Sequence, residues 1–519
     1  MTDSQVAPDS NTSSIGLFFL LLRDLIFVSL FGDLICVLLF GGRAGLQPRI
    51  LISPPQCFSP RILALRRYPR VFAFFLTFFA LFSTGLMAQS PAQVTVVRAA
   101  RLLDPRTGNV LSPAAVLLEG DKIKAVGSPT QVQAQAAAGA HTIDLGSATL
   151  LPGLIDCHTH LLLDVVTPPD AESKRHENGK FAPGLLLAIV ESPIKRAFLG
   201  AQMAREDLES GITTVRNLGH SGIDGDTELR DAINSGRVRG PRILASARKL
   251  ITRGDYVQNL NPALADSILQ QEFLFIDRAD QARQAIRQNV FHNVDVIKVT
   301  ADERLTVPEL AAAIEEAHRD HLKVAVHAVE MTSIQTAIDS GTDSIEHGNE
   351  ATDEQLKQMR EKSIFLDLTP TEYGGFFRKI TKPIIVRSPA LRSVRIRTDA
   401  RRDQLYDQLV QRVLKSGVKF AAGSDMGWFY PEGTRGQASV TTLLNLHTAG
   451  VPPLDVIRAI TVNAAEMLGW QDRIGAIEPG KYADRIGVAG DPVADITELE
   501  RVRFVMKNGE VVKNAFAAH

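Results

Sequence analysis

Short apolar runs alternate with longer amphipathic stretches through the middle of the chain. Apolar runs bounded by Gly, Pro, Asn or Asp are typical of buried strands, and apolar residues spaced three or four positions apart are typical of helices. This pattern predicts eight strands, at residues 154–160, 213–218, 242–246, 295–300, 323–328, 343–347, 363–368 and 419–425. It predicts helices between them, at residues 197–210, 280–288, 307–321, 331–340, 353–361 and 402–416. Eight alternating units predict an α/β fold, the (β/α)₈ TIM barrel, whose chemistry lies at the carboxyl ends of its strands.

Both flanks of this region contain shorter strands separated by Gly, Pro and Asp. They are predicted at residues 94–97, 115–118, 123–126 and 142–144, and again within residues 480–491 and 502–512. A hairpin turn is expected at Asn508-Gly509. We therefore expect one small discontinuous β domain, formed by residues 89–150 and 476–519, around a barrel domain at residues 151–475.

Residues 1–88 do not resemble the rest of the chain. Arg66, Arg67 and Arg70 precede an apolar run that ends in the small residue Ala88, which is the layout of an export signal. The pattern predicts cleavage before Gln89 and a periplasmic or secreted protein. Because such a signal normally starts near the N-terminus, we interpret residues 1 to about 60 as the product of a misassigned start codon. The alternative is an uncleaved segment that anchors the protein in a membrane.

Composition and net charge limit the kinds of molecule that the protein is expected to bind. The formal net charge is −1, so the sequence predicts neither nucleic-acid binding nor a basic membrane patch. The three cysteines are Cys36, Cys57 and Cys157, and only Cys157 lies in the predicted folded body, which excludes an internal disulfide framework there. Cys157 precedes His158 in a strand and should point to the opposite side, so we interpret it as a packing residue.

The first predicted barrel strand ends in His158 and His160. Alternate side chains of a strand point to the same side, so both imidazoles can reach one metal ion. Pro152 and Gly153 mark a bend at the start of this strand. A His-X-His pair alone is a moderate signal, and it becomes strong only when other ligands meet it in space.

Four further residues lie in or at the ends of predicted strands: Lys298, His327, His347 and Asp425. A lysine inside an apolar strand is rarely buried without a partner. A neutral lysine can add carbon dioxide to become a carbamate, an anionic ligand able to bridge two cations. The alternatives are a snorkelling or salt-bridged lysine, hydrogen-bonded core histidines, and an aspartate that caps a helix or stabilises a turn.

This ordered set resembles the amidohydrolase superfamily with a binuclear centre, over about residues 94–512. A smaller group, the imidazolonepropionase-related amidohydrolases, includes metal-dependent dipeptidases of prolidase-like and Xaa-Arg types and ochratoxin-hydrolysing amidases. The motifs similar to this group are Leu151-Pro-Gly-Leu-Ile-Asp, Gly211-Ile-Thr-Thr-Val-Arg, Gly240-Pro-Arg-Ile-Leu and Val296-Ile-Lys-Val. Relatives often carry a Gly-Gly-His-Gly loop after strand three, where this chain has Ile251-Thr-Arg-Gly-Asp-Tyr256. The substrate contacts of that loop are therefore not transferable.

The resemblance implies two divalent metal ions, with zinc as the first expectation. His158 and His160 would hold one ion with Asp425, His327 and His347 would hold the other, and a CO2-derived carbamate on Lys298 would bridge them. A hydroxide between the ions would attack an amide carbonyl. Asp425 would act as general base and then as general acid.

The implied activity is hydrolysis of the amide bonds of dipeptides or N-acyl amino acids, with a small-molecule amide or peptide as the only expected partner besides a possible second copy of the chain. Cyclic amide hydrolysis or deamination is the alternative within the superfamily. Imidazolonepropionase itself is mononuclear and lacks the bridging lysine, so Lys298 argues against that activity. A non-catalytic binding barrel is a remote alternative, because it would be expected to have lost a ligand.

Three residues are candidates for contacts with the substrate. Arg216, at the end of the second strand, and Tyr256 could bind a substrate carboxylate or be structural. His220, just after the second strand, could reach the pocket.

Overall fold

The computed structural model describes residues 94–164, 191–253, 261–301, 304–370, 389–427 and 433–516. The predicted export signal, the whole of residues 1–88 and Tyr256 lie outside these ranges. Within them, no helix combines the length and apolarity needed to cross a membrane.

Parallel strands form the centre of the protein. One sheet has the order β10-β9-β8 and another has the order β12-β11-β13-β14-β15-β16-β17. Their bounds are β8 Leu154–Thr159, β9 Ile212–Asn217, β10 Arg242–Ala245, β11 Lys249–Ile251, β12 Phe273–Phe275, β13 Val296–Thr300, β14 Lys323–Ala328, β15 Ser344–His347, β16 Phe365–Leu368 and β17 Phe420–Ala422. Every pairing in both sheets is parallel.

The two sheets are in contact at two places, near the start of β13 and after the end of β17. The Asp295 backbone N–H donates to the carbonyl oxygen of Ala245 at 2.8 Å, and a parallel bridge joins Thr159 to Met426. The domain is therefore TIM-barrel-like, although its strands are divided over two sheets instead of one continuous ladder. One interruption has a local cause: Ala247 has a φ of 52°, and its N–H donates to the buried Asp226 carboxylate, which separates β10 from β11.

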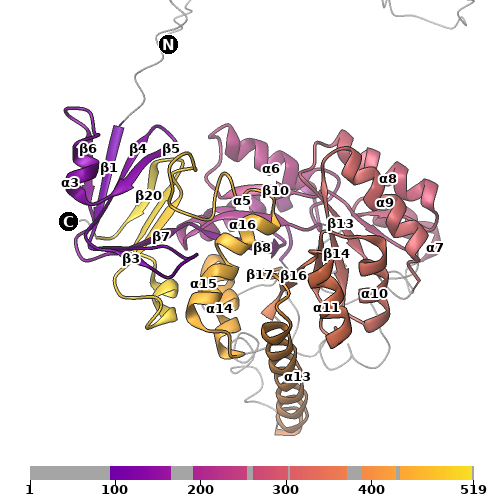
Figure 1. The fold of residues 1–519 in the computed structure, drawn as a ribbon. Coiled ribbons are helices and arrows are strands. Elements are labelled where there is room, and N and C mark those ends of the chain that lie inside the picture. Colours follow the sequence, from indigo (N-terminus) through magenta and orange to yellow (C-terminus); the bar gives the residue numbers. More distant parts are fainter. Residues whose placement is uncertain are drawn as a thin grey trace, which may run out of the picture. The chain divides into compact units, whose positions relative to one another are not determined.

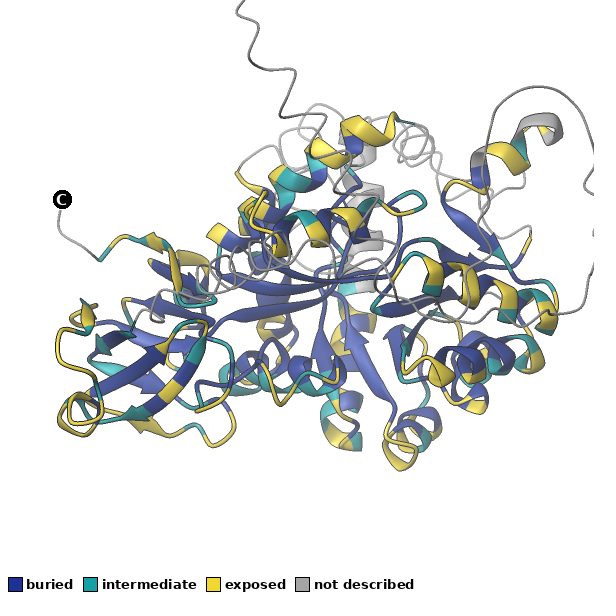
Figure 2. Ribbon diagram, turned by 90° about the horizontal axis from the view of Figure 1, so that it is seen from above, coloured by how far each residue is buried: buried dark blue, intermediate teal, exposed yellow. Residues whose placement is uncertain are grey.

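Helices cover the outside of the parallel strands. Their bounds are α5 Pro193–Glu209, α6 Gly225–Asn234, α7 Pro262–Leu269, α8 Ala279–Phe291, α9 Val307–Arg319, α10 Met331–Ser340, α11 Asp353–Glu361, α13 Pro389–Ser416, α14 Arg435–Thr448, α15 Pro453–Ala459 and α16 Val462–Met467. Figure 2 shows buried strands in dark blue and exposed helix faces in yellow. At the start of α9, Glu309 accepts hydrogen bonds from the N–H and hydroxyl of Thr306, which forms a capping box.

Strands from both flanks of the chain share one sheet. Its order is β20-β19-β18-β7-β2-β3, and a second sheet has the order β5-β4-β1-β6. The bounds are β1 Val94–Ala99, β2 Arg101–Leu103, β3 Val110–Leu111, β4 Ala114–Glu119, β5 Lys122–Gly127, β6 His141–Asp144, β7 Thr149–Pro152, β18 Arg485–Val488, β19 Phe504–Lys507 and β20 Glu510–Asn514, with the short helices α3 Pro129–Gln133 and η4 Ile496–Arg501. Figure 1 shows yellow strands of the C-terminal flank in the same part of the molecule as indigo strands of the N-terminal flank, and β18 pairs with β7.

An unusual arginine lies in this β-rich part. Arg485 is fully buried, and its strand partner Met506 belongs to an apolar cluster that includes Leu118 and Phe504. None of the three guanidinium nitrogens of Arg485 has a hydrogen-bond partner among the described residues. Burial lowers the pKa of this guanidinium to about 9. A buried cation without hydrogen-bond partners is costly, although the charge of the nearby Asp484 carboxylate offsets part of this cost.

Some elements were not predicted by the apolar pattern. The strands β7, β11 and β12 and the helices α6, α7, α14, α15 and α16 are additional. Most of the predicted barrel strands are longer than the observed ones, and in particular β8 ends at Thr159 and β17 ends at Ala422. His160 and Asp425 thus lie in the segments that follow these strands.

Candidate metal centre

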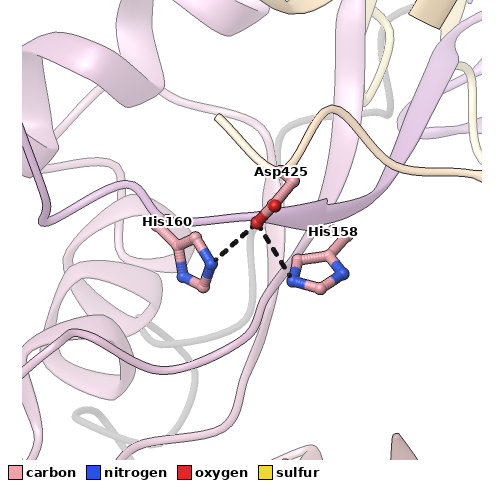
Figure 3. Close-up of side chains that lie close together, drawn as sticks. All are labelled: His158, His160 and Asp425. Atoms are coloured by element: carbon pink, nitrogen blue, oxygen red, sulfur yellow. Dashed lines mark hydrogen bonds and ion pairs between the residues drawn. The ribbon is translucent and has the colours of Figure 1, made fainter. Parts of the chain in front are cut away.

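The side chains of His158, His160 and Asp425 converge at the ends of β8 and β17. The Asp425 Oδ1 lies 3.1 Å from His160 Nε2 and 3.4 Å from His158 Nε2. Figure 3 shows this carboxylate between the two rings. Both imidazoles are buried, whereas 26% of the Asp425 side chain is exposed. The carboxylate is therefore the member of the group that meets the solvent side.

The other predicted ligands lie beside this group. The His347 ring centroid is 5.1 Å from that of His158 and 4.5 Å from that of His327. Lys298 is 2% exposed, and its Nζ lies 3.4 Å from His158 Nε2. The structure thus places four imidazoles, one lysine and one carboxylate in a single cluster.

The main chain is held tightly where β8 passes the end of β17. The Asp156 carboxylate accepts hydrogen bonds from the backbone N–H and the hydroxyl of Ser424, at 2.8 and 2.6 Å. A Cβ on Gly423 would lie 2.2 Å from His158 Cβ, so only glycine permits this approach. Arg435, buried on α14, donates to Thr159 Oγ1 at 2.8 Å. These contacts fix the ends of both strands, which carry the candidate ligands.

Two buried carboxylates lie behind His158. The Glu346 Oε2 is 3.1 Å from His158 Nδ1, and the Asp367 Oδ2 is 3.6 Å from the same atom. Burial raises the pKa of Asp367 well above its usual value, and the adjacent Glu346 raises it further. The Arg216 guanidinium holds the pKa of Glu346 well below its usual value, against the effect of burial. Neither carboxylate was predicted, although each interrupts an apolar strand as Lys298 does.

The buried Arg216 side chain forms several hydrogen bonds next to the candidate site. Its guanidinium donates to Cys157 O at 2.5 Å, to Ser344 Oγ at 3.1 Å and to Glu346 Oε2 at 2.8 Å. These contacts favour the structural alternative over a role in binding substrate, because the guanidinium orients the carboxylate that faces His158. Cys157 is buried in an apolar cluster, in agreement with its interpretation as a packing residue.

His220 does reach the site. Its ring centroid is 5.0 Å from that of His160, and its Nε2 is 2.9 Å from Nζ of Lys249, a buried lysine that the sequence did not single out. His220, His347 and Asp425 have φ values of 56°, 72° and 49°. Non-glycine residues rarely adopt this left-handed conformation, and such strain concentrates at functional sites.

Electrostatics at the cluster favour neutral imidazoles. Burial lowers the pKa of His158, His160, His327 and His347, that of His347 to about 4. Nearby histidines hold the pKa of Asp425 well below its usual value, although burial opposes them. The site therefore contains neutral rings and an ionised carboxylate near neutral pH.

The donor set fits a metal cation. His160 Nδ1 faces the carbonyl oxygen of Gly219 at 3.2 Å, and His158 Nδ1 faces Glu346, so these nitrogens carry the ring protons. The Nε2 lone pairs of both rings then point toward the ionised Asp425. Three converging acceptors repel one another unless a cation lies between them, and imidazole with carboxylate is a typical ligand set for zinc. A second set of side chains able to bind a metal consists of His158, Glu346 and Asp367. Its two carboxylates form ion pairs with Arg216.

A candidate metal centre at the strand ends of a TIM-barrel-like α/β domain defines a class of hydrolases. The chain belongs to the amidohydrolase family, whose profile matches residues 149–512. The family is generally dependent on a binuclear metal centre and acts on small molecules.

The chain is similar to several characterised proteins. It is 27% identical to an ochratoxinase from Aspergillus niger over 460 residues, covering 81% of this chain and 87% of the relative. It is 25% identical to an imidazolonepropionase from Shouchella clausii over 429 residues, covering 78% of this chain and 86% of the relative. A solved Xaa-Pro dipeptidase with methionine bound in its active site superimposes with a TM-score of 0.63 at 26% identity, covering 81% of this chain and all of that structure.

Proposed function

We propose that this hydrolase uses two metal ions to cleave the amide bonds of dipeptides or N-acyl amino acids. The observation that carries the proposal is the convergence of His158 Nε2, His160 Nε2 and the ionised Asp425 on one point. Similarity to an ochratoxinase and to a Xaa-Pro dipeptidase supports amide substrates that contain an amino acid.

The chain's residues would share the two ions as follows. His158, His160 and Asp425 would hold one ion, His327 and His347 the other, and a carbamate on Lys298 would connect the two. Burial lowers the pKa of Lys298 to about 8, which makes the neutral amine needed for carbamate formation accessible near neutral pH. When bound, the ions would supply Lewis-acid polarisation of the amide carbonyl and a lower pKa for the attacking water.

Asp425 is the proposed proton-transfer residue. Its carboxylate lies between His158 and His160 and is more exposed than either imidazole. It would accept a proton from the attacking water and return it to the nitrogen of the leaving amine, as general base and then general acid. Glu346, oriented by Arg216, would keep the His158 ring in the tautomer that offers Nε2.

Metal removal tests this proposal. Purified protein should hold about two divalent ions per chain, and exhaustive chelation should lower hydrolysis of dipeptides and N-acyl amino acids by at least about 100-fold. Zinc or another divalent ion should restore the activity, and release of a free amino acid should accompany each turnover. Full activity after complete metal removal would contradict the proposal.

Cyclic amides are the rival substrates, because an imidazolonepropionase is among the similar proteins. The same protein preparation should therefore be assayed with ring-opening and deamination substrates. Activity on these alone would replace the proposed substrate class while leaving the metal centre in place.

We also propose the wider organisation expected from the sequence. Residues 151–475 would act as a closed (β/α)₈ barrel, and residues 89–150 with 476–519 would act as one discontinuous β domain. Residues 66–88 would direct the protein to the periplasm or the medium. Support comes from the sheet shared by strands of both flanks and from the basic-then-apolar pattern before Gln89.

A further inference from the structure

Arg435, in the first turn of α14, contacts both of the segments that carry His160 and Asp425. Its side chain is buried, and its guanidinium donates to Thr159 Oγ1 at 2.8 Å and to the His160 carbonyl oxygen at 3.2 Å. It also donates to the carbonyl oxygen of Met426, and all three contacts involve Nη2. One group thus connects the chain that follows β8 with the chain that follows β17.

These two segments lie beyond the ends of their strands. His160 follows β8 and Asp425 follows β17, so neither residue is held by the regular ladder of its own strand. The His160 N–H donates to the Met426 carbonyl oxygen at 3.0 Å, and this carbonyl is the one that also accepts from Arg435. The guanidinium therefore reinforces the backbone hydrogen bond that joins the two segments directly after Asp425.

The backbone of Asp425 has a conformation that needs support from its surroundings. Its φ is 49°, in the left-handed region that is uncommon for residues other than glycine. Such a conformation persists only where neighbouring contacts enforce it. Because Asp425 Oδ1 lies 3.1 Å from His160 Nε2, a change in this φ would move the carboxylate relative to that ring. The contact of Arg435 with the next residue, Met426, is one of the contacts that oppose the change.

Contacts between α14 and α5 fix the main chain of the arginine. A Cβ on Gly436 would lie 2.1 Å from the Glu206 carbonyl oxygen, so the start of α14 lies directly against the α5 main chain. The Glu206 carboxylate accepts a hydrogen bond from the Arg435 backbone N–H at 2.8 Å. Thr434 and Gln437 form a capping box at this end of the helix. The guanidinium therefore extends from a firmly held helix start.

We propose that Arg435 is a positioning residue that sets the separation of the His160 and Asp425 side chains. It would thereby raise the affinity for the ion assigned to His160 and Asp425, without affecting the ion assigned to His327 and His347. Because its contacts are with main-chain carbonyls and a hydroxyl group of the protein, it would act through the ligands and not on the substrate. This inference rests on the proposed function, since it assumes the two ions.

Zinc binding by Arg435→Lys, measured by competition with a chromogenic chelator, tests the inference. Lysine keeps the positive charge but lacks the planar fork that contacts several oxygens at once. In protein that also carries His347→Ala, which removes a ligand of the second ion, Arg435→Lys should weaken zinc binding about 10–100-fold. In protein that instead carries His160→Ala, the same substitution should leave the affinity for the remaining ion unchanged.

Thr159→Val gives a second and milder test. It removes one acceptor of the guanidinium and leaves Arg435 in place, so it should weaken zinc binding with the same selectivity and to a smaller extent. Kinetics with an N-acyl amino acid give a further readout. In excess zinc, kcat of Arg435→Lys should fall about 10–100-fold with KM nearly unchanged, because the guanidinium does not contact the substrate in the proposed role.

A matched control is Arg230→Lys, at another buried arginine. Its guanidinium pairs with Asp295 at 2.6 Å, just before the start of β13 and therefore at the opposite strand ends from the candidate ligands. This variant should change Tm while zinc affinity and kcat remain those of wild type. Tm of every variant should be measured beside zinc affinity, because a purely structural arginine would change Tm alone.

The outcomes separate this inference from the proposed function. If wild type binds no zinc or cleaves no amide of the proposed class, the proposed function fails. If wild type does both, and Arg435→Lys weakens both ions equally or neither of them, the positioning role is overturned while the proposed function stands. If Arg435→Lys does not fold, Thr159→Val decides the question, and unaltered zinc binding by that variant would overturn the role of Arg435.

Discussion

Lys298 and Lys249 are buried lysines, and their burial makes both of them candidates for a functional role. Both side chains lie almost fully out of solvent in strands of the parallel sheets, where an ammonium is costly. For Lys298 the lowered pKa and the contact with His158 Nε2 are consistent with conversion to a neutral, reactive amine. A salt-bridged lysine would instead need a carboxylate within contact distance of Nζ.

Lys298→Ala tests the carbamate. The activity of the variant should fall by at least about 10–100-fold, which is the usual effect of losing a residue that supports a metal site. The variant should also lose most of the second metal, while the domain still folds. Acetate or propionate at high concentration should restore part of the activity by filling the bridging position. Bicarbonate present during metal reconstitution should help wild type only.

A structural lysine would give the opposite pattern. Lys298→Ala would then lower Tm, and no small acid would rescue catalysis. Near-normal turnover with two metals bound would exclude the bridging role and would favour a mononuclear site with the cyclic-amide activity.

Arg485 gives a prediction about stability. Because its guanidinium is buried without a partner among the described residues, Arg485→Met should raise the free energy of unfolding by about 1–4 kcal/mol. Thermal unfolding followed by circular dichroism measures the change, and Arg503→Met, at an exposed arginine just before β19, is the control. An unchanged or lower Tm for Arg485→Met would show that this arginine has a partner in solution.

The residues of the candidate site were predictable from the sequence, whereas the residues that support them were not. His158, His160, Lys298, His327, His347 and Asp425 stood out because polar residues ended or interrupted apolar runs. Glu346, Asp367 and Lys249 carry the same signal and were passed over because an acid or a base in a strand can also face solvent. Only the packing of neighbouring strands decides which side is buried.

At the scale of elements, α5 and α14 pack through a buried polar contact. Asp207 of α5 accepts a hydrogen bond from Ser439 Oγ of α14 at 3.2 Å. Burial raises the pKa of Asp207 from 3.8 to about 7, although the charge of Arg435 opposes this. Its folded-state pKa exceeds its unfolded value, so the folded state binds the extra proton between about pH 4 and pH 7.

The contact should therefore weaken as pH rises. Between about pH 4 and pH 7, ionisation of Asp207 lowers the free energy of unfolding by up to about 1.4 kcal/mol per pH unit. The loss is complete above the folded-state pKa. Asp207→Asn cannot ionise, so its Tm relative to wild type should increase from pH 5 to pH 7 and then level off. Scanning calorimetry at pH 5, 6, 7 and 8 tests this, and a constant difference in Tm would contradict it.

Element prediction succeeded where apolar residues follow one another without interruption. The helices α10 and α11 were predicted with their observed bounds, and each of the eight predicted strands corresponds to an observed strand within a few residues. The third predicted strand ended at Ser246. The sequence pattern did not reveal that the chain turns at Ala247 and continues in β11, so β11 was not predicted. The helices α14, α15 and α16 follow the last barrel strand, where the repeating pattern gave no expectation.

At the scale of the whole molecule, the sequence of residues 1–88 predicts how the chain is processed after synthesis. If residues 66–88 form an export signal, the mature chain should begin near Gln89 and be found outside the cytoplasm. N-terminal sequencing of protein from cell fractions measures this. An intact segment 1–60 on a cytoplasmic form would contradict both the signal and the proposed start site, and a membrane-bound full-length form would support the anchor.

The sheet shared by both flanks sets the order in which the chain can finish folding. β7 pairs with β2 on one side and with β18 on the other, and Gly153 joins β7 directly to β8 and His158. During synthesis, β18 leaves the ribosome only after the entire barrel region has been made. The edge of β7 therefore stays unpaired until translation is nearly complete, and pairings so distant in sequence form slowly. A chain interrupted before residue 485 is expected to leave the start of β8 less firmly held, because β7 lacks its β18 neighbour, although the contacts of Asp156 and Arg435 at the carboxyl end of β8 are already present.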